Sequence, residues 1–379
     1  MSLPCQCKLQ KRKDVIIAIK FFDMFSGIGG FRSGLEQAGG FECIGSCEID
    51  KYAAAAYKAM YDTGKEAYYS DITRIDTGEM SDFDLLTGGF PCQPYSAASP
   101  NARGFDDPRG ALFFELARII RDKQPAAFLF ENVRSLLAHN GGKTYKEILT
   151  TLSELGYIIE WRLLNTRSWL PQERKRIYIV GHHRADCAGE IFRFEESGGA
   201  NLLKVIGGTQ GQRVYDSSGI ACTQCAGDGG QGVHTGLYTV DMNPDPKILD
   251  YIRCIVARYD SGITNFKGSS SGVLVEMSPM VIDLADKSEF FESERTAYAV
   301  VVVDENGNVR YFRIRKLLPV ESWRAQGFTT EQFNKAAALG ICDSRLYKMS
   351  GNAVSVPVIK VIGERIRDII FCEGGEKIA

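Results

Sequence analysis

The sequence predicts an α/β protein, with a mostly parallel sheet covered by helices on both faces and a second, smaller β-rich domain. Up to about residue 183, short apolar runs alternate with stretches of helical period. Repetition of strand and helix in this way builds parallel sheets. Residues 186–312 are instead rich in Gly, Ser, Thr and Asp, and contain only short strand-like pieces. This change in composition and in the length of the elements predicts the second domain.

Six apolar runs are expected to form the strands of the main sheet. They cover residues 15–25, 41–49, 83–90, 126–130, 158–164 and 176–181. Four stretches with helical spacing lie between them, at residues 30–37, 51–61, 110–122 and 144–155. Parallel sheets place their sites at the carboxyl ends of the strands. The loops of interest therefore follow Phe25, Glu48, Phe90, Phe130 and Leu164.

Two helical patterns lie outside this alternation. Residues 246–258 form the one long helical pattern of the β-rich part, and residues 356–370 form an amphipathic helix after a Gly-Asn turn. The apolar face of the last helix needs a docking surface, and we expect the first domain to provide it. The predicted domains are therefore 15–185 with 345–372, and 186–344. The termini, 1–14 and 373–379, are expected to be flexible.

Composition is that of a globular protein. Of 379 residues, 44% are hydrophobic and 24% are charged, which excludes disorder, collagen and coiled coil. The net charge of −2 produces no global basic field. Two local segments are basic, with six Arg/Lys against one acid in 161–184 and five against one in 310–324. They suit an anionic partner, although solvated faces would show the same pattern.

Cysteine usage indicates a reducing compartment. The eleven cysteines are odd in number and scattered, so we expect free thiols in a cytoplasmic protein. Neither the pair Cys222 and Cys225 nor the pair Cys5 and Cys7 has a second pair at zinc-ligand spacing, and no metal is expected. No apolar run approaches the length of a membrane span, and no membrane association is expected.

Four strand ends carry candidate chemistry. A glycine-rich turn at Asp23–Phe31 suits a nucleotide-like ligand, although a tight strand-to-helix turn needs glycines too. The acids Glu48 and Asp71 suit ribose hydroxyls and an amino group. Cys92, in a proline-flanked loop, suits a nucleophile better than a buried apolar role. Glu131 ends another strand, where a cap or a salt bridge is the alternative.

Together and in order, these motifs resemble the DNA cytosine-5 methyltransferase family, of the bacterial and phage type. The resemblance covers nearly the whole chain. Its parts are DMFSGIGGFRSGLEQAG, GGFPCQPYS, ENV, QERKR, RKLLPVESWRAQGF and LYKMSGNAVSVPV. Residues 208–240 resemble the target-recognition segment of bacterial members. The resemblance implies a Rossmann-like domain that binds S-adenosylmethionine, and a smaller target-recognition domain at 186–344.

The resemblance also implies residue roles. Cys92 matches the nucleophile, Glu131 the residue that protonates cytosine N3, and Asn132 the support of that loop. Arg176 matches the arginine that contacts cytosine O2, and Arg174 its loop-ordering neighbour. The positions that match the cofactor pocket are Phe25, Gly27, Gly29, Glu48, Ile49, Asp71, Ile72, Pro91, Leu112, Asn352 and Val354. The positions that match DNA contacts are Ser96, Arg109, Gln210, Gln212 and Thr223.

The implied function is transfer of a methyl group from S-adenosylmethionine to C5 of a flipped-out cytosine in duplex DNA, leaving S-adenosylhomocysteine. Two departures from the family pattern are mild, Tyr95 for Phe and Ala353 for Ser. The stretch 241–312 is longer than in the smallest members, which leaves the target sequence open. A monomer is expected, and a separately acting restriction endonuclease is a candidate partner.

Three rival functions account for some of these motifs. A dinucleotide oxidoreductase would use the glycine turn but leaves the PCQ, ENV and QERKR motifs without a purpose. Methylation of transfer RNA on the same scaffold is a closer alternative, and the long recognition region favours DNA over it. A regulator that binds cofactor and DNA without turnover is the third, and the presence of Cys92, Glu131 and Arg176 argues against it.

Overall fold

The fold is taken from a computed structural model of the chain. It describes residues 18–91, 110–184, 189–194 and 317–371. Between residues 203 and 316 it describes only the backbone of short strands. Predictions that fall on other residues lie outside the described part of the chain.

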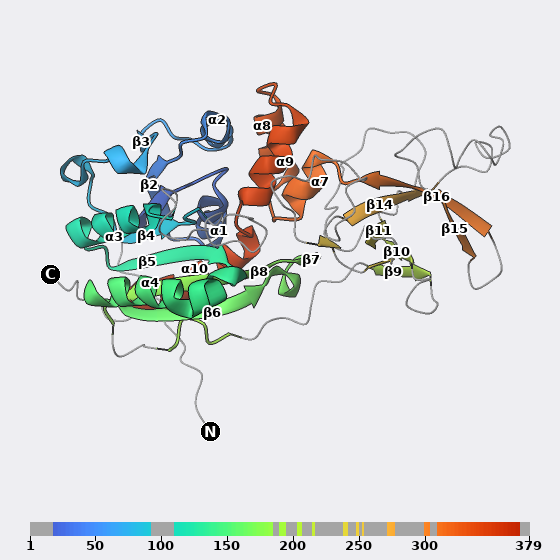
Figure 1. Ribbon diagram of the computed structural model, residues 1–379. Coiled ribbons are helices and arrows are strands. Elements are labelled where there is room, and N and C mark those ends of the chain that lie inside the picture. The colour runs from blue at the N-terminus through green and yellow to red at the C-terminus, as the bar shows by residue number, and fades with distance from the viewer. Residues whose placement is uncertain are drawn as a thin grey trace, which may run out of the picture.

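A seven-stranded sheet forms the main body of the protein (Figure 1). Its strand order is β3-β2-β1-β4-β5-β8-β6. The strands are β1 (Ile19–Met24), β2 (Phe41–Cys47), β3 (Ala67–Tyr69), β4 (Leu85–Gly88), β5 (Ala127–Val133), β6 (Ile158–Asn165) and β8 (Lys175–His182). The first five in this order run parallel, whereas β8 is antiparallel to both of its neighbours. The mostly parallel sheet is confirmed, and the short strand β3 was not predicted.

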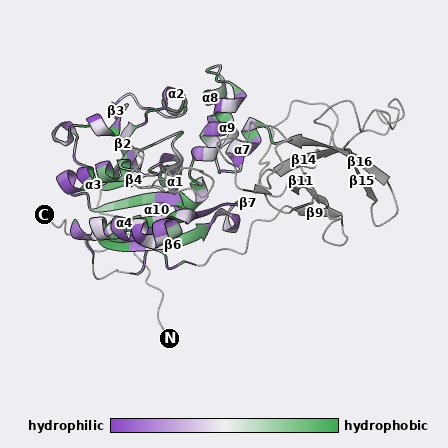
Figure 2. Cartoon of the chain, viewed as in Figure 1, coloured by the Kyte–Doolittle hydropathy of each residue, from purple (hydrophilic) through white to green (hydrophobic). Residues whose placement is uncertain are grey.

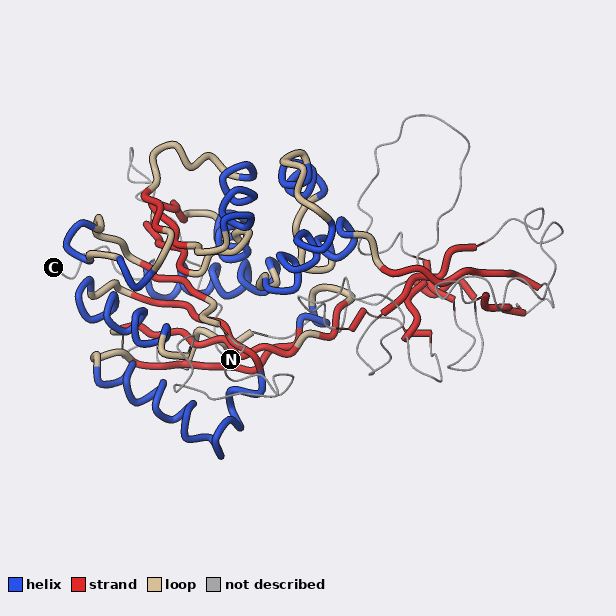
Figure 3. Tube along the Cα trace, turned by 45° about the horizontal axis from the view of Figure 1, so that its top comes forward, coloured by secondary structure: helices blue, strands red, loops and turns tan. Residues whose placement is uncertain are grey.

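Helices cover both faces of this sheet, as predicted (Figure 3). On one face, α3 (Leu112–Lys123) and α4 (Lys143–Glu154) pack on side chains such as Phe22 and Phe128. On the other face, α1 (Gly30–Ala38) and α10 (Val356–Ile366) pack on Phe21 and Leu129. The strands are apolar on both sides because both sides are covered (Figure 2).

The last helix docks on the first domain, as expected. A Cβ added to Gly34 of α1 would lie 2.5 Å from Cβ of Ile359 on α10, so the two helices meet at closest approach. A single π-helical turn, η10 (Arg367–Phe371), follows α10. Among the described helices, none combines the length and the hydropathy that a bilayer span needs.

Three helices precede α10 and pack near α2 (Lys51–Met60). They are α7 (Pro319–Arg324), α8 (Thr330–Ala337) and α9 (Asp343–Asn352). Trp323 and Phe328 share an apolar cluster with Ile28 and Ala56. The predicted domain boundary at residue 344 stays a prediction, and these contacts favour an earlier boundary, near residue 317.

The region from 203 to 316 is rich in strands, as predicted. A five-stranded sheet has the order β12-β11-β14-β16-β15, and β9 pairs with β10. These strands are β9 (Leu203–Ile206), β10 (Val214–Asp216), β11 (Tyr238–Asp241), β12 (Ile248–Leu249), β14 (Ser271–Glu276), β15 (Ala299–Val303) and β16 (Val309–Lys316). A role for this region in target recognition stays a prediction.

The helix predicted at residues 246–258 is wrong. This range contains β12 and β13 (Ile252–Arg253). β12 pairs with β11, and β13 pairs in parallel with β7 (Gln172–Glu173) of the first domain. Such short segments become strands when they lie along the edge of another strand, because backbone hydrogen bonding with that strand outweighs a weak local preference for helix.

Candidate active site

The glycine-rich turn joins β1 to α1 through three left-handed residues. Phe25, Gly27 and Gly29 have φ angles of 53°, 55° and 77°. A Cβ on Gly29 would come within 2.5 Å of the Tyr61 ring. The buried Ser26 hydroxyl has no hydrogen-bond partner among the described residues. The turn therefore offers bare backbone and a free hydroxyl at the carboxyl end of β1, where a ligand can approach closely.

Glu48 lies beside this turn, at the end of the neighbouring strand β2. Its Oε2 accepts a hydrogen bond of 2.8 Å from the Gly27 N–H, and its Oε1 accepts one of 2.7 Å from the Asp50 N–H. Burial raises the pKa of this carboxyl above its usual range. Ile49, next in the chain, is 76% exposed, which is unusual for so large an apolar side chain. A carboxylate beside an exposed apolar group suits a nucleoside.

The other predicted cofactor residues near β3 and α3 are less open. The Asp71 carboxylate accepts hydrogen bonds from the backbone N–H and the hydroxyl of Thr73, which lower its pKa. Ile72 is 3% exposed, within the core. Leu112 is the first residue of α3 and packs on the same cluster as Phe25.

The fold brings Val354, one of the predicted cofactor residues, to the glycine-rich turn. A Cβ on Gly30 would lie 2.6 Å from Cγ2 of Val354. Asn352 ends α9 and is exposed, whereas Val354 is buried. Residues more than 300 positions apart thus meet at the start of α1, in agreement with the grouping that the resemblance implied.

Glu131 and Arg176 face each other across β5 and β8. The Arg176 Nε lies 3.0 Å from Glu131 Oε1. Glu131 is 8% exposed. Burial raises the pKa of its carboxyl, and the positive charges of Arg176 and Arg174 partly oppose this effect. A raised pKa favours the protonated form of a carboxyl group, which is the form that can donate a proton to a base.

Asn132 connects this pair to the loop that carries Cys92. The Asn132 side chain is fully buried, and its Nδ2 donates a 3.2 Å hydrogen bond to the carbonyl of Phe90. Gly89, Phe90 and Pro91 follow β4 directly. Cys92 itself lies outside the described residues, and so do Ser96, Arg109, Gln210, Gln212 and Thr223. The structure therefore places the start of the loop beside Glu131 and does not test these six positions.

Arg174 connects β8, which carries Arg176, to the segment around Asn352. It is 2% exposed. Its Nη2 donates a 2.8 Å hydrogen bond to the Ala353 carbonyl, and both of its Nη atoms lie 3.3 Å from the Gly351 carbonyl. These carbonyls flank Asn352 at the end of α9, where a cation also favours the helix dipole. The residue predicted to order a loop thus lies between the two predicted binding regions.

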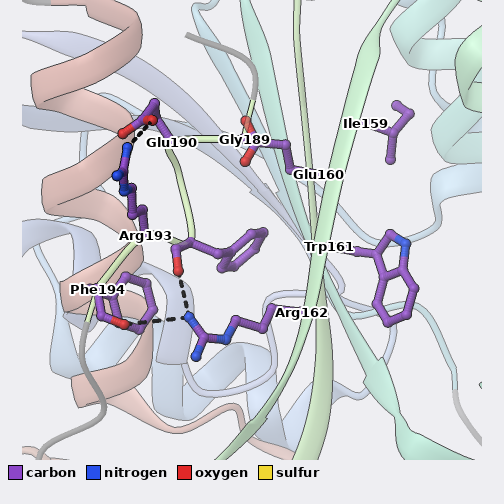
Figure 4. A pocket seen from close by; sticks show the side chains of 9 residues that line it. Ile159, Glu160, Trp161, Arg162, Gly189, Glu190, Arg193 and Phe194 are labelled. Carbon is purple, nitrogen blue, oxygen red and sulfur yellow. Dashed lines mark hydrogen bonds and ion pairs between the residues drawn. The ribbon is translucent and has the colours of Figure 1, made fainter.

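A hollow of about 800 Å³ lies elsewhere, on edge strand β6 (Figure 4). Its side chains come from both sides of that strand, with Trp161 on one side and Arg162 on the other. Arg162 already donates to the carbonyls of Phe192 and Phe194, and Arg193 pairs with Glu190. Because its charges are paired within the chain and it is remote from the ends of β1, β2 and β5, it is not the candidate site.

Within the described part of the chain, no three His, Cys, Asp or Glu side chains gather as a metal site would require. The prediction that no metal is needed stays a prediction. Sequence reasoning did not identify Tyr68 or Lys348, which contact the loop around Glu48. Lys348 reaches Asp50 from 298 residues away, and nothing local in the sequence signals such a contact.

Comparison with known proteins identifies the family. The model described as C-5 cytosine-specific DNA methylase matches residues 19–368, most of the chain. The chain belongs to this family. It is a C-5 cytosine DNA methyltransferase, and membership of the family implies the use of S-adenosylmethionine.

Several relatives are similar over most of their length. The type II methyltransferase M1.ScrFI of Lactococcus lactis subsp. cremoris is 35% identical over 361 residues, covering 93% of this chain and 78% of the relative. The type II methyltransferase M.NlaX of Neisseria lactamica is 32% identical, covering 95% and 99%. The orphan methyltransferase M.Rho11sI of Bacillus phage rho11s is 29% identical, covering 91% and 97%.

Solved structures agree on the fold. The Schizosaccharomyces pombe (S. pombe) Dnmt2 methyltransferase has a TM-score of 0.58 and 19% identity, covering 93% of this chain and 99% of that structure. A methyltransferase of Entamoeba histolytica has a TM-score of 0.57 and 18% identity, covering 93% and 98%. At this identity the likeness concerns the fold alone.

Proposed function

We propose that this protein methylates C5 of a flipped-out cytosine in a specific duplex DNA sequence, through a covalent bond between Cys92 and cytosine C6. One observation carries the proposal. A buried carboxyl, Glu131, is paired with Arg176, and Asn132 ties the same strand to the peptide that precedes the Cys92 loop. An acid, a cation and the residues that lead into the Cys92 loop thus meet at the ends of β4, β5 and β8.

The residues at the end of β1 fit S-adenosylmethionine. The bare backbone of the turn, the unpartnered Ser26 hydroxyl, the fixed Glu48 carboxylate and the exposed Ile49 are groups that a nucleoside with a charged tail would use. Each Glu48 oxygen accepts one backbone hydrogen bond and keeps capacity for a ribose hydroxyl. When bound, the cofactor supplies the electrophilic methyl group.

The side chains then have distinct tasks. The Cys92 thiolate adds to C6 of the base while Glu131 gives a proton to N3, and the C5–C6 unit becomes an enamine that is nucleophilic at C5. Arg176 orients the base and keeps Glu131 in place. After methylation, a base removes the C5 proton, the thiolate leaves C6, and N3 returns its proton to Glu131. Electrons and protons balance over the cycle, so Cys92 and Glu131 are regenerated.

The base must leave the helix for these atoms to be reached, at a cost of a few kcal/mol that contacts in the pocket offset. Ser96 and Arg109 would close over DNA, and Gln210, Gln212 and Thr223 would read the sequence. The two basic segments would contact phosphates. The relatives named type II methyltransferases support a role in restriction–modification, with a separate endonuclease, and the phage relatives support a solitary enzyme instead.

Labelled S-adenosylmethionine, unmethylated duplex DNA and transfer RNA provide the test. We expect label in the DNA, and bisulfite sequencing will locate the target cytosine. Label in transfer RNA alone would favour the RNA alternative, and binding without transfer would favour the silent regulator.

Cysteine variants test the nucleophile directly. Cys92→Ser should retain cofactor binding and lose turnover. The matched control is Cys342→Ser, because Cys342 is exposed and is the N-cap residue of α9, an element separate from β4. An oligonucleotide with 5-fluorocytosine at the mapped site should become covalently attached to the wild-type protein and not to Cys92→Ser. Turnover by Cys92→Ser close to that of the control would contradict the assignment.

A further inference from the structure

The main chain of Glu48 is held on both sides by β3. The Glu48 N–H donates a 3.1 Å hydrogen bond to the Tyr69 carbonyl. The Glu48 carbonyl accepts a 2.9 Å hydrogen bond from the Tyr68 hydroxyl. The Tyr68 side chain is otherwise at the surface, 39% exposed. Its hydroxyl is therefore placed where it fixes the peptide that carries the Glu48 side chain, with little involvement in the core.

The Glu48 carboxylate is held by the next turn of chain. Its Oε1 accepts the Asp50 N–H at 2.7 Å. Asp50 in turn caps α2, and its Oδ1 accepts the N–H groups of Tyr52 and Ala53. Any movement of Asp50 would therefore move the donor that orients Glu48.

A third segment anchors Asp50 from the other end of the sequence. The Lys348 Nζ, on α9, lies 2.7 Å from Asp50 Oδ2. Although partial burial opposes it, this contact and the cap hydrogen bonds hold the pKa of Asp50 below its usual value, which favours the ionised carboxylate. The same helix ends at Asn352, two residues before Val354, which lies against Gly30 next to the glycine-rich turn.

We infer that Tyr68 and Lys348 are positioning residues of the cofactor site, which hold Glu48 in its binding geometry, Tyr68 through the main chain and Lys348 through Asp50. The inference rests on the proposed function, in which Glu48 binds the cofactor ribose. Fixing a carboxylate before binding removes the cost of ordering it in the complex. Loss of Tyr68 or of Lys348 is therefore expected to lower the affinity for the cofactor.

If Tyr68 and Lys348 only stabilised the fold, their loss would lower the unfolding midpoint. Exposed ion pairs and surface hydroxyls contribute little to folding stability. The side chains of Lys348 and Asp50 are 45% and 28% exposed. Loss of either positioning contact should therefore leave the unfolding midpoint nearly unchanged and still weaken cofactor binding.

The test measures binding of S-adenosylmethionine to the full chain by calorimetry, which needs no knowledge of the DNA target. Tyr68→Phe and Lys348→Met should each weaken binding about threefold to tenfold, the usual range for one hydrogen bond. The loss should appear in KM for the cofactor rather than in kcat. Lys348→Arg should restore most of the affinity, because the guanidinium can pair with Asp50.

Matched controls are available on the same elements. Tyr69→Phe makes the same change at the next residue of β3 and keeps the carbonyl that Glu48 uses. Lys335→Met removes a lysine of similar exposure, which pairs with Glu331 at 2.9 Å on α8. If Tyr68→Phe and Lys348→Met bind the cofactor as well as these controls do, the inference is overturned.

Glu48→Gln separates this inference from the proposed function. If Glu48→Gln binds the cofactor as the wild type does, the role of Glu48 fails, and the positioning inference fails with it. If Glu48→Gln binds the cofactor weakly and Tyr68→Phe binds it as tightly as the control Tyr69→Phe does, only the positioning inference fails. In the double variant that combines Glu48→Gln with Tyr68→Phe, the loss of cofactor affinity caused by Tyr68→Phe should be smaller than in the wild-type background, because Tyr68 acts through Glu48. Full additivity would contradict that route.

Discussion

Burial controls the protonation of three carboxyl groups near the strand ends. Glu131, Glu48 and Asp23 all have pKa values raised by desolvation. Their partners differ. Glu131 faces Arg176, Glu48 accepts two backbone N–H groups, and Asp23 accepts one hydrogen bond, from Thr87. The same physical effect therefore gives one group suited to proton donation, one suited to hydrogen bonding with a ligand, and one held inside the sheet.

Glu131→Gln tests the proton donor. The amide fills the same space and can hydrogen-bond to the base, but it has no acid proton to give to N3. We expect kcat to fall about 10²- to 10⁴-fold, the usual contribution of general acid catalysis, with little change in cofactor affinity. Single-turnover methylation of the mapped DNA site measures the rate, and calorimetry measures the cofactor affinity as the control. A kcat close to that of the wild type would contradict the assignment.

Asp23→Asn tests the buried acid in β1. Asp23 is fully buried, and one of its oxygens has no hydrogen-bond partner among the described residues. Burial raises its pKa to about 8, whereas an unfolded Asp titrates near about 4. The native state thus binds more protons between these values, so wild-type stability should fall as pH rises from about 4 to about 8.

Asn cannot ionise, so the variant lacks this decline. The difference in free energy of unfolding, variant minus wild type, should become more positive with rising pH and level off above about pH 8. Denaturant unfolding from pH 5 to 9 measures it. A difference that is constant over this range would contradict the raised pKa.

At the scale of elements, the site depends on how strands end and helices begin. α1 starts at Gly29, whose left-handed backbone and contact with Tyr61 leave no room for a side chain. α2 starts at Asp50, whose side chain caps it and whose N–H holds Glu48. β5 and β8 run antiparallel with Arg176 opposite Val133, two residues along β5 from Glu131, so the Glu131 and Arg176 side chains meet diagonally across the two strands. Each functional contact is therefore made by the end of a regular element.

Gly29→Ala should destabilise the protein by more than backbone strain alone. A left-handed Ala costs roughly 1–2 kcal/mol, and the added Cβ would also lie 2.5 Å from the Tyr61 ring. Gly156→Ala is the control, because Gly156 has a φ of 92° and no atom within 4 Å of the added Cβ. We expect a loss of unfolding free energy at least about 1 kcal/mol larger for Gly29→Ala, from the overpacking. Equal losses would show that the Tyr61 contact relaxes freely.

At the scale of the whole molecule, the C-terminal part completes the first domain. α10 packs on α1, and Trp323 of α7 lies in a cluster with Ile28 and Ala56. Buried polar contacts join the same parts, since Gln172 Nε2 donates to the Ala325 carbonyl at 2.7 Å and Arg174 holds the end of α9. The region predicted to bind the cofactor is therefore built from both ends of the described chain.

Trp323→Ala tests the packing of the C-terminal helices on the first domain. Trp323 is fully buried, and its Nε1 donates to the Leu346 carbonyl. Loss of a buried Trp typically costs about 3–5 kcal/mol. Trp161→Ala is the control, because Trp161 is 45% exposed and lies on edge strand β6. Denaturant unfolding should show a much larger loss for Trp323→Ala. Equal losses would mean that residues 317–344 contribute little to the stability of the first domain.

The sequence alone determined the alternation of strands and helices, the glycine-rich turn and the order of the family motifs, because these are local patterns of spacing and residue type. It did not determine that 246–258 contains strands, since those residues pair with β11 and β7. It also did not reveal the contacts of Lys348 with Asp50 or of Arg174 with Gly351 and Ala353, which join segments 177 to 298 residues apart. Only the tertiary structure decided these, because burial and contact between distant segments set them, and no local pattern encodes either.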